Sequence, residues 1–484
     1  MKKHKNIGTL CYIAAVCALL ALPTLTLPLA LNQADDTAEN RVLSSFPVWK
    51  GENGNMNRAF LTELTAWYGE HFGLRNEMVT AYGTLTREAL NTSANDDVIC
   101  GKEGWLFYGE TLSDSIGVAT LNDTEISHIV QTLSMLQIYA ESKGTKFVFT
   151  SAPNKASIYP QYLPARYLPR DTANNCDLLY AALQAADVSF CNLHTVLQTQ
   201  AEKDPAQLYH KLDSHWNGYG AMTAFSALTK QVGHSDGGFP AMGCSAVRDF
   251  HGDLWGMLSP SVENPDWNIV YDIPQSYEYL GRYRGVDDLT IQTVCGEGNG
   301  SLLMFRDSFG RALIPLFSQV YQTATYTRDN RVPIDLLETT PPDTIIYELV
   351  ERNLPNLLQY APQMPAPMVE APVISTTDAV TVPVLQTRAA GSYLHCYGSY
   401  DATLADNECI VITVQNMDGT SASYQAFPCY EADLLGETAP QCNGYSLYLP
   451  KNAVTDGAVC SVSVKLQSGF ASAGTVTYHE QNPS

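Results

Sequence analysis

The sequence predicts an α/β domain that follows an apolar N-terminal segment and precedes an all-β domain. Three observations predict this order. Apolar runs typical of buried strands alternate with segments of helical periodicity across residues 96–361. Residues 7–31 contain no charged side chain, and residues 373–484 show the period-two alternation of strands. At 484 residues the chain has room for two or three domains.

Residues 1–32 predict a membrane anchor. The 25 uncharged residues from Ile7 to Leu31 exceed the ~20 that span a bilayer as a helix, and the lysines before them favour a cytoplasmic N-terminus. A cleaved signal peptide is the alternative, although no clear small-x-small cleavage site follows. We therefore expect a single-pass membrane protein with its main domain outside the cytoplasm, or a secreted protein if the segment is cleaved.

Residues 33–95 predict a polar stalk and then two helices interrupted near Gly73. Residues 96–361 predict the α/β domain. Its expected elements are a hairpin at Val98–Tyr108, a helix at Asp123–Ser142 capped by Asp123 or Thr124, and buried strands at Lys146–Pro153, Leu302–Phe305 and Asp343–Leu354. Ligands of an open α/β sheet bind beyond the carboxyl ends of its strands, so polar residues at those ends are the candidate site.

Ser308 is the candidate nucleophile. It follows the strand at 302–305 and precedes an apolar run at helical spacing. Its hydroxyl would therefore lie at the top of the sheet, where amides at a helix N-terminus could hold an oxyanion. This geometry is typical of acyl transfer. Taken alone, however, Asp307-Ser308 is more often an ordinary N-cap pair.

Asp213 and His215 supply the other parts that a serine nucleophile needs, namely a histidine base and a carboxylate that fixes the tautomer of that base. An Asp-x-His pair could also be a capped turn or a pair of metal ligands. Since no other His/Asp cluster with metal-ligand spacing accompanies it, we predict no metal site and no cofactor.

Three further residues near strand ends are candidates for binding the oxyanion or the substrate. Asn154 could donate to the oxyanion or stabilise its loop, and Lys155 could hold a substrate oxygen or brace the loop. Arg352 could contact the substrate, although pairing with Glu351 is the expected alternative. Asp253, in the segment HGDLWGML, is expected in a structural loop near the rim of the site.

The motif DSHW at 213–216, followed by Asn217 and Gly218, and the motif DSF at 307–309 resemble those of the DHHW and alginate O-acetyltransferase-like proteins, circularly permuted members of the SGNH hydrolase superfamily. Ser214 stands where the family name has a second histidine. Other segments fit the family in the same order, so that the resemblance covers residues 38–358: ENRVLSSFP, HFGLRN, GKEGWLFY, APNKASIYP and VERNL. It implies an SGNH-hydrolase-like sheet flanked by helices, an Asn154 that matches the consensus SGNH asparagine, and a membrane-bound acyl-transfer protein as acetyl donor.

The charge of the chain limits its partners. A net charge of −22 and a pI near 4.7 argue against nucleic acid, since phosphate binding needs a basic surface. A strongly anionic polymer would also be repelled at long range. A neutral glycan is easier to reconcile with this balance.

Twelve cysteines without a CxxC pair favour disulfides in an oxidising compartment over a zinc or redox site. We expect the pairs Cys176–Cys191 and Cys244–Cys295. The five cysteines of the C-terminal domain need Cys100 as an outside partner or leave one thiol free. These five are Cys396, Cys409, Cys429, Cys442 and Cys460.

Residues 362–372 are rich in proline and predict a linker. Residues 373–484 predict an all-β sandwich that disulfides would stabilise. Such a domain could bind carbohydrate through tyrosine rings, although cross-strand packing is the commoner role of tyrosine in a sheet. The candidate tyrosines are Tyr393, Tyr397, Tyr400, Tyr424, Tyr430, Tyr445 and Tyr448.

Three functions follow from these observations. The first is an extracytoplasmic polysaccharide O-acetyltransferase in which Ser308, His215 and Asp213 form and resolve an acetyl-enzyme intermediate, with a cell-surface polysaccharide as acceptor. The second is a carbohydrate acetyl esterase, in which the same triad transfers the acetyl group to water. The third is a non-catalytic, anchored glycan-binding protein, and the intact triad argues against it.

Overall fold

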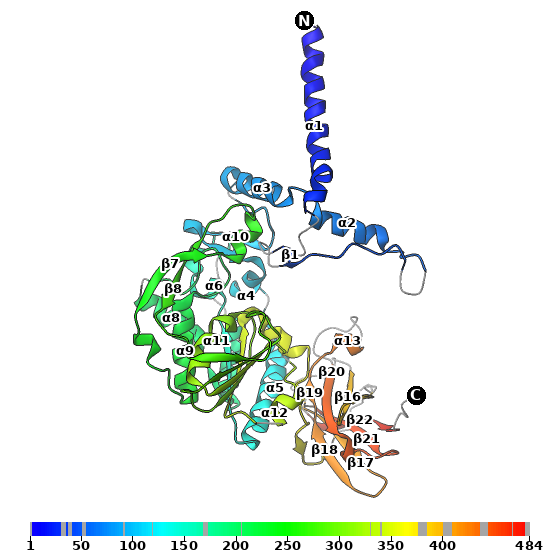
Figure 1. Cartoon of the computed structure of the whole chain (residues 1–484). Coiled ribbons are helices and arrows are strands. Elements are labelled where there is room, and N and C mark those ends of the chain that lie inside the picture. The colour runs from blue at the N-terminus through cyan, green and yellow to red at the C-terminus, as the bar shows by residue number, and fades with distance from the viewer. Residues whose placement is uncertain are drawn as a thin grey trace.

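The chain folds into a group of N-terminal helices, a central α/β domain and a C-terminal β domain (Figure 1). The predicted fold class is therefore confirmed. The computed structural model describes residues 2–30, 35–36, 41–50, 55–90, 92–118, 120–167, 173–204, 206–329, 331–338, 341–375, 385–399, 409–435, 444–466 and 468–479.

The central sheet has seven strands, and its middle strands run parallel. Its last two strands are antiparallel to their neighbours. All seven residues of the predicted strand near Asp343 are buried, as expected for a parallel strand with both faces covered. In spatial order the strands are β6 (Phe190–Cys191), β5 (Lys146–Ala152), β13 (Thr344–Val350), β11 (Ser301–Phe305), β12 (Thr323–Thr327), β10 (Thr290–Cys295) and β9 (Tyr277–Leu280).

Helices cover both faces of this sheet, so the domain has two apolar cores. Alternate strand residues divide between them: Leu302 and Met304 pack into one core, and Leu303 and Phe305 into the other. The first core includes helices α8 (Leu193–Lys203), α9 (Gly218–Val232) and α11 (Ile314–Val320). The second includes α5 (Asp123–Ser142) and α7 (Asn175–Ala185).

Helix α5 has the predicted bounds but not the predicted cap. Asn122 is the N-cap, and its side chain accepts the amide hydrogen of Glu125 while the Glu125 carboxylate accepts that of Asn122. The predicted hairpin is formed by β3 (Val98–Cys100) and β4 (Leu106–Tyr108). Short elements of this domain are α4 (Leu112–Ser115), α6 (Lys155–Ile158), α12 (Ile334–Glu338), and the 3-10 helices η5 (Phe309–Ala312) and η6 (Glu351–Leu358).

An insertion between α9 and the sheet covers the carboxyl edge of the strands. It consists of the antiparallel pair β7 (Cys244–Phe250) and β8 (Asp266–Tyr271), with helix α10 (Asp253–Leu258) between them. In Figure 1 these elements lie beside α9 and above the central sheet.

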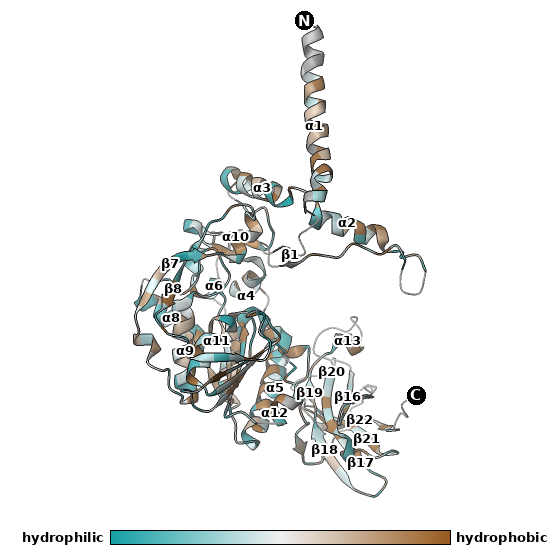
Figure 2. Cartoon of the chain, viewed as in Figure 1, coloured by the Kyte–Doolittle hydropathy of each residue, from teal (hydrophilic) through white to brown (hydrophobic). Residues whose placement is uncertain are grey.

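The N-terminal region consists of α1 (Lys2–Ala30), a pair of two-residue strands β1 (Asp35–Asp36) and β2 (Arg41–Val42), and helices α2 (Phe60–His71) and α3 (Arg75–Leu90). The predicted helix pair is thus confirmed, with its interruption at residues 72–74. Helix α1 projects away from the rest of the chain, and apolar residues lie along its length (Figure 2). The stretch Gly8–Pro28 is long and apolar enough to cross a membrane.

The C-terminal domain is a sandwich of two antiparallel sheets around a third apolar core. Tyr424, Tyr445 and Tyr448 are buried, so these candidate sugar-stacking rings pack in the interior instead; Tyr400 lies outside the described residues. Phe427 and Cys429 extend into the core of the α/β domain, which joins the two domains. The remaining elements are β14 (Met368–Val369), β15 (Gln386–Ala390), β16 (Tyr393–Ser399), β17 (Ile410–Gln415), β18 (Ser421–Gln425), β19 (Phe427–Pro428), α13 (Ala432–Leu435), β20 (Gly444–Pro450), β21 (Val459–Leu466) and β22 (Gly469–Thr477).

The disulfide predictions are wrong. All eleven described cysteines are free thiols, and Cys442 lies outside the described residues. Cys176 donates to the Ser151 hydroxyl at 3.5 Å, in the interior between α7 and β5. Cys244 is exposed at the start of the insertion, whereas Cys295 is buried at the end of a sheet strand. The spacing of cysteines along the sequence does not tell in which direction their side chains point. The domains are held together by their apolar cores.

Candidate active site

Ser308 lies in the turn that follows strand β11, directly before η5. Its neighbour Asp307 determines the shape of this turn. One carboxylate oxygen of Asp307 accepts the Phe309 amide hydrogen at 2.9 Å. The other accepts the Val350 amide hydrogen at 2.7 Å and a side-chain hydrogen of Asn353 at 2.8 Å. Asp307 therefore connects the nucleophile turn to the carboxyl end of the neighbouring strand β13.

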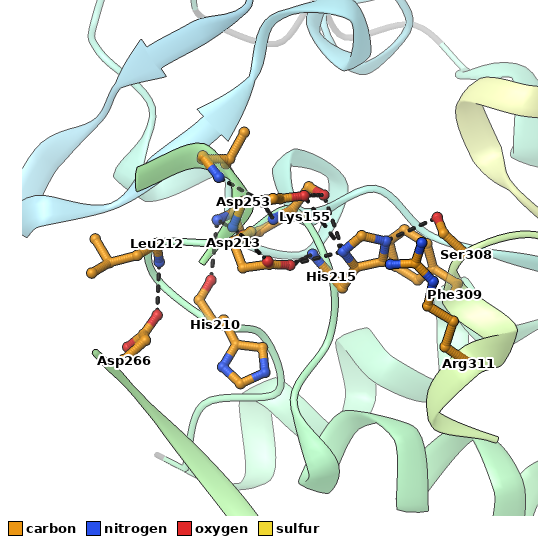
Figure 3. Close-up of polar contacts among 12 residues, drawn as sticks. Lys155, His210, Leu212, Asp213, His215, Asp253, Asp266, Ser308, Phe309 and Arg311 are labelled. Carbon is orange, nitrogen blue, oxygen red and sulfur yellow. Dashed lines mark hydrogen bonds and ion pairs between the residues drawn. The ribbon is translucent and has the colours of Figure 1, made fainter. Parts of the chain in front are cut away.

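His215 reaches Ser308 from the loop that precedes α9 (Figure 3). Its Nε2 lies 2.9 Å from the Ser308 hydroxyl oxygen. Its Nδ1 lies 2.8 Å from Oδ1 of Asp213, and the same oxygen accepts the His215 backbone amide hydrogen at 2.7 Å. The structure thus brings together the three residues that the sequence analysis selected, although 93 positions separate His215 from Ser308.

Asp213 is buried and ionised. Burial by itself raises the pKa of its carboxyl group, but the His215 ring and hydrogen bonds from His215 and the Asp253 amide outweigh burial and hold that pKa well below its usual range. An ionised Asp213 favours the tautomer with the proton on Nδ1 of His215. Nε2 is then free to accept the Ser308 proton.

Asp253 is a second carboxylate at the same imidazole. It lies at the start of α10, and its Oδ2 is 3.6 Å from Nδ1 of His215. It accepts hydrogen bonds from the Ser214 hydroxyl at 2.6 Å and the Ser214 amide at 2.8 Å. Burial and the adjacent Asp213 charge raise the pKa of Asp253. The sequence analysis placed Asp253 only at the rim; the segment HGDL was the available signal, but nothing in it indicated contact with His215.

Asp213, His215 and Asp253 also have the spacing of a metal site, since one ligand atom from each lies within 4.8 Å of the others. A cation bound there would take the Nδ1 that now bonds Asp213. It would also remove the tautomer control on which a histidine base depends. The hydrogen-bonded arrangement fits a base for Ser308 better than a metal centre.

Lys155 lies beneath the His215 loop. Its ammonium donates to the backbone carbonyls of Asp213 at 2.5 Å, His210 at 3.1 Å and Lys211 at 3.2 Å. Burial lowers the pKa of Lys155 to about 8, against the opposing effect of the Asp213 charge. Because the three donors of the ammonium are directed at loop carbonyls, these contacts favour bracing of the loop over contact with substrate.

Asn154 follows strand β5, and Arg352 lies in η6, which follows strand β13. The Asn154 backbone amide donates to Oε2 of Glu351 at 2.8 Å. The Asn154 side chain is buried, and neither of its amide atoms has a hydrogen-bond partner among the described residues. The guanidinium of Arg352 lies 5.5 Å from the ring centre of Phe309, the residue after Ser308, and 5.6 Å from that of Tyr108.

A cavity of about 660 Å³ opens at Ser308 and His215. Helix α10 and the β7–β8 pair form one wall, which includes Trp255 and Phe250, and the residues after Ser308 form the other, which includes Pro315. Acidic Glu263 and the amides of Asn264 and Asn268 also line it. Apolar and aromatic walls with a few polar groups are typical of a site for an organic substrate. Asn154, Lys155 and Arg352 are not among the described residues that line this cavity.

A parallel sheet that ends in a serine, opposite a histidine and an aspartate on a loop, is the arrangement of an SGNH-type hydrolase or acyltransferase domain. Residues 98–259 match the family described as "SGNH hydrolase-like domain, acetyltransferase AlgX". The resemblance found in the sequence is therefore confirmed over these residues, which are similar to an AlgX-type SGNH hydrolase-like domain.

The curated proteins similar to the chain are named as probable alginate O-acetylases. The chain is 22% identical over 335 residues to the probable alginate O-acetylase AlgJ of Pseudomonas syringae pv. tomato, which covers 63% of this chain and 79% of that protein. It is 25% identical over 183 residues to the probable alginate O-acetylase AlgJ of Pseudomonas putida, which covers 37% of this chain and 44% of that protein.

Solved structures similar to the chain include an O-acetyltransferase domain and a DHHW family protein. The O-acetyltransferase domain of Pseudomonas putida AlgJ is 17% identical with a TM-score of 0.39, over 55% of this chain and 94% of that one. A DHHW family protein from Eubacterium siraeum is 14% identical with a TM-score of 0.40, over 53% of this chain and 94% of that one. At these scores the fold assignment rests on the strand order of the chain itself and on the family match.

Proposed function

We propose that the protein is an extracytoplasmic O-acetyltransferase that modifies a polysaccharide through an acetyl-enzyme intermediate. The observation that carries this proposal is the 2.9 Å approach of His215 Nε2 to the Ser308 hydroxyl, with Nδ1 held at 2.8 Å by Asp213. These are hydrogen-bond distances, as an activated serine requires. The family match and the names of the relatives support acetyl transfer as the reaction.

In the first half-reaction, the Ser308 oxygen attacks the carbonyl carbon of an acetyl donor while His215 takes the hydroxyl proton. The Asp213 carboxylate stabilises the imidazolium that forms. The tetrahedral intermediate collapses when the bond from its carbon to the donor group breaks, and His215 returns the proton to that leaving group. Ser308 then carries the acetyl ester.

The oxyanion of the intermediate needs donors that are not already engaged. The Phe309 amide donates to Asp307, so it does not supply one. The Ser308 amide is our first candidate. The unpartnered side-chain amide of Asn154 is the second, and it would have to turn toward the cavity, which it does not line in this structure. Arg352, beside Phe309, is placed to add positive charge near the turn.

In the second half-reaction, a sugar hydroxyl gives its proton to His215 and its oxygen attacks the acetyl carbon. The bond from that carbon to the Ser308 oxygen then breaks, and His215 returns the proton to Ser308. We propose a neutral segment of a cell-surface polysaccharide as acceptor, because Asp213, Asp253 and Glu263 all line the cavity and the net charge is −22. The acetyl donor would be a membrane-bound acyl-transfer protein, reached while α1 anchors the chain. The C-terminal sandwich would then add contacts to the same polymer.

The test combines a trapped intermediate with a cellular readout. Wild-type protein given an acetylated chromogen should gain 42 Da on the peptide that contains Ser308, the mass of one acetyl group in place of hydrogen, as acyl-enzyme catalysis requires. Cells with Ser308→Ala should lose the acetyl esters of their surface polysaccharide. Unchanged surface acetylation in those cells would remove the proposal and favour an anchored glycan-binding protein.

An acetyl esterase is the alternative that shares this geometry. Ser308 is half-buried in a cavity that water can enter, so water could resolve the acetyl-enzyme. Turnover of the chromogen with and without an oligosaccharide separates the two functions. A transferase moves the acetyl group to the added sugar, whereas an esterase releases acetate at the same rate in both cases.

A further inference from the structure

Helix α3 has its apolar side turned outward. Its exposed large side chains include Met78, Tyr82 and Leu85, of which Tyr82 is 59% and Leu85 63% exposed. The spacing of four and three residues places them along one face of the helix. A helix that only supported the domain would turn this face inward.

The opposite face of α3 packs against α10 and is made of small and polar residues. Gly83 lies so close to the Leu258 carbonyl that an added Cβ would be 2.3 Å from its oxygen. The Thr80 hydroxyl accepts the Ser261 amide hydrogen at 3.0 Å. Because this contact fixes the rotation of α3, the apolar face cannot turn toward the domain.

Helix α3 begins beside the C-terminal part of the apolar helix α1. The Gly73 amide donates to the Pro23 carbonyl at 3.0 Å, and the Thr24 and Tyr68 hydroxyls are 2.7 Å apart. These contacts join the C-terminal part of α1 to the ends of α2 and α3 that face each other. Figure 1 shows α3 lying across the direction of α1, with α10 on the side away from the free end of α1. Because the polar face of α3 packs on α10, its apolar face is turned toward the side on which α1 extends.

We propose that helix α3 lies in the interfacial layer of the membrane that α1 enters, with Met78, Tyr82 and Leu85 among the lipid head groups and upper acyl chains. The stretch Gly8–Pro28 lies next to the start of α3, and none of its described side chains is buried. Amphipathic helices that lie in an interface bury one apolar face in this way.

The lipid that this face fits is zwitterionic. Helix α3 carries two basic residues, Arg75 and Arg87, and two acidic ones, Glu77 and Glu88. With these charges balanced and a net charge of −22 on the chain, attraction to anionic head groups does not hold the helix. Burial of the apolar face of α3 holds the helix at the membrane instead, and α1 keeps the helix close to the bilayer.

This placement has a consequence for the cavity. Helix α10, which packs on the inner face of α3, contributes Asp253, Trp255 and Gly256 to the cavity wall. A helix held in the interface would therefore keep the mouth of the cavity at a fixed short distance from the bilayer. Membrane contact by α3 does not depend on the proposed acetyl transfer, so either can fail without the other.

The experiment is site-specific photocrosslinking of the full-length protein in nanodiscs of alkyne-tagged phosphatidylcholine. p-Benzoylphenylalanine replaces Tyr82, a ring for a ring at an exposed position. The matched control replaces Ile138, which is 57% exposed on α5, away from α1. We expect roughly tenfold more lipid adduct at position 82 than at position 138, because an interfacial helix holds its apolar face among the lipids.

Two outcomes would overturn the proposal. The first is a lipid adduct at position 82 no greater than at position 138. The second is an adduct at position 82 only with protein when the same variant is irradiated in native membranes, which would assign the face to a second copy or to an integral membrane protein. Circular dichroism and thermal unfolding that match the wild type show that both labelled variants are folded.

Discussion

The loop that carries His215 and the turn that carries Ser308 meet over one cavity but are held in place differently. The turn is held by its own neighbour, Asp307, through bonds to backbone amides and Asn353. The loop is held from outside, by Lys155 of α6 below it and Asp253 of α10 beside it. The difference lies in the number of supports: one aspartate next to Ser308 ties the turn to the end of strand β13, whereas a lysine and an aspartate from two other elements hold the loop around the Asp213–His215 pair.

The largest expected effect comes from Asp213→Asn, which removes the charge on which the base depends. Turnover of an acetylated chromogen should fall about 10⁴-fold, because the amide favours the wrong histidine tautomer. Asp343→Asn is the control, since Asp343 bonds Ser301 at the far end of strand β11 and should leave turnover unchanged. Comparable losses in both variants would mean that Asp213 acts only through stability.

Asp213 also makes a pH-dependent contribution to stability. Since the pKa of its carboxyl is lower in the folded chain than its ordinary value of about 3.9, the unfolded state binds more protons as the pH falls. The contribution is complete above that ordinary value and is lost as the pH falls toward the folded pKa. Urea unfolding of the wild type between pH 5 and pH 3 should show this loss, and Asp213→Asn should show less of it.

The next largest effect is expected for Asp307→Asn, which tests how the turn that carries Ser308 is held. The new amide group would point its hydrogens at the Val350 amide and the Asn353 side chain, which are themselves donors. We expect turnover to fall about 10²-fold through misplacement of Ser308, and the free energy of unfolding to fall by about 1–3 kcal/mol. Full activity in this variant would contradict local control of the turn.

Lys155→Met tests the support of the base loop, with Lys146→Met as its control. Each lysine donates to backbone carbonyls, but Lys146 bonds Val232 away from the cavity. Turnover should fall roughly tenfold for Lys155→Met, because the carbonyls of the His215 loop lose their donors, and should be unchanged for Lys146→Met. Equal turnover in the two variants would show that the loop does not need its brace.

The same pair of variants gives a test at alkaline pH. The pKa of Lys155 is lowered to about 8 in the folded chain, from an ordinary value of 10.5. Between these values the unfolded state binds more protons, so Lys155 makes stability rise with pH across this window. Urea unfolding at pH 8 and pH 10 should show a smaller rise for Lys155→Met than for Lys146→Met.

The smallest effect is expected for Ser214→Ala. This change removes the 2.6 Å hydrogen bond to Asp253 and the 3.2 Å contact of the Ser214 hydroxyl with Nδ1 of His215, but it leaves the bond from the Ser214 amide to Asp253. We expect turnover to fall about fivefold, equivalent to ~1 kcal/mol for one hydrogen bond. Asp253→Asn should remove most of this difference in a double-mutant cycle, and simple additivity of the two changes would place Ser214 outside the support of His215.

Features that depend on neighbouring residues could be predicted from the sequence. The apolar runs that became β5, β11 and β13 were recognisable because a parallel strand is buried on both faces. Ser308 was recognisable because it follows such a run and precedes a helical pattern. Asp213 and His215 were recognisable because they lie two positions apart in a motif.

Features that depend on three-dimensional proximity could not be predicted. The role of Lys155 required the 210–213 loop to pass over it, and the contact of Asp253 with His215 required α10 to close beside that loop. The expected disulfides were wrong because spacing along a chain does not give the direction of a side chain.

The sequence by itself determined the strands, the succession of domains and the three candidate residues Asp213, His215 and Ser308, because each is written in a local pattern of apolar and polar residues. Only the tertiary structure decided that these three residues meet, how their loop is supported, and that the apolar face of α3 remains uncovered. The reason is that a local pattern specifies which side of a segment is apolar, whereas packing between distant segments decides what that side will contact.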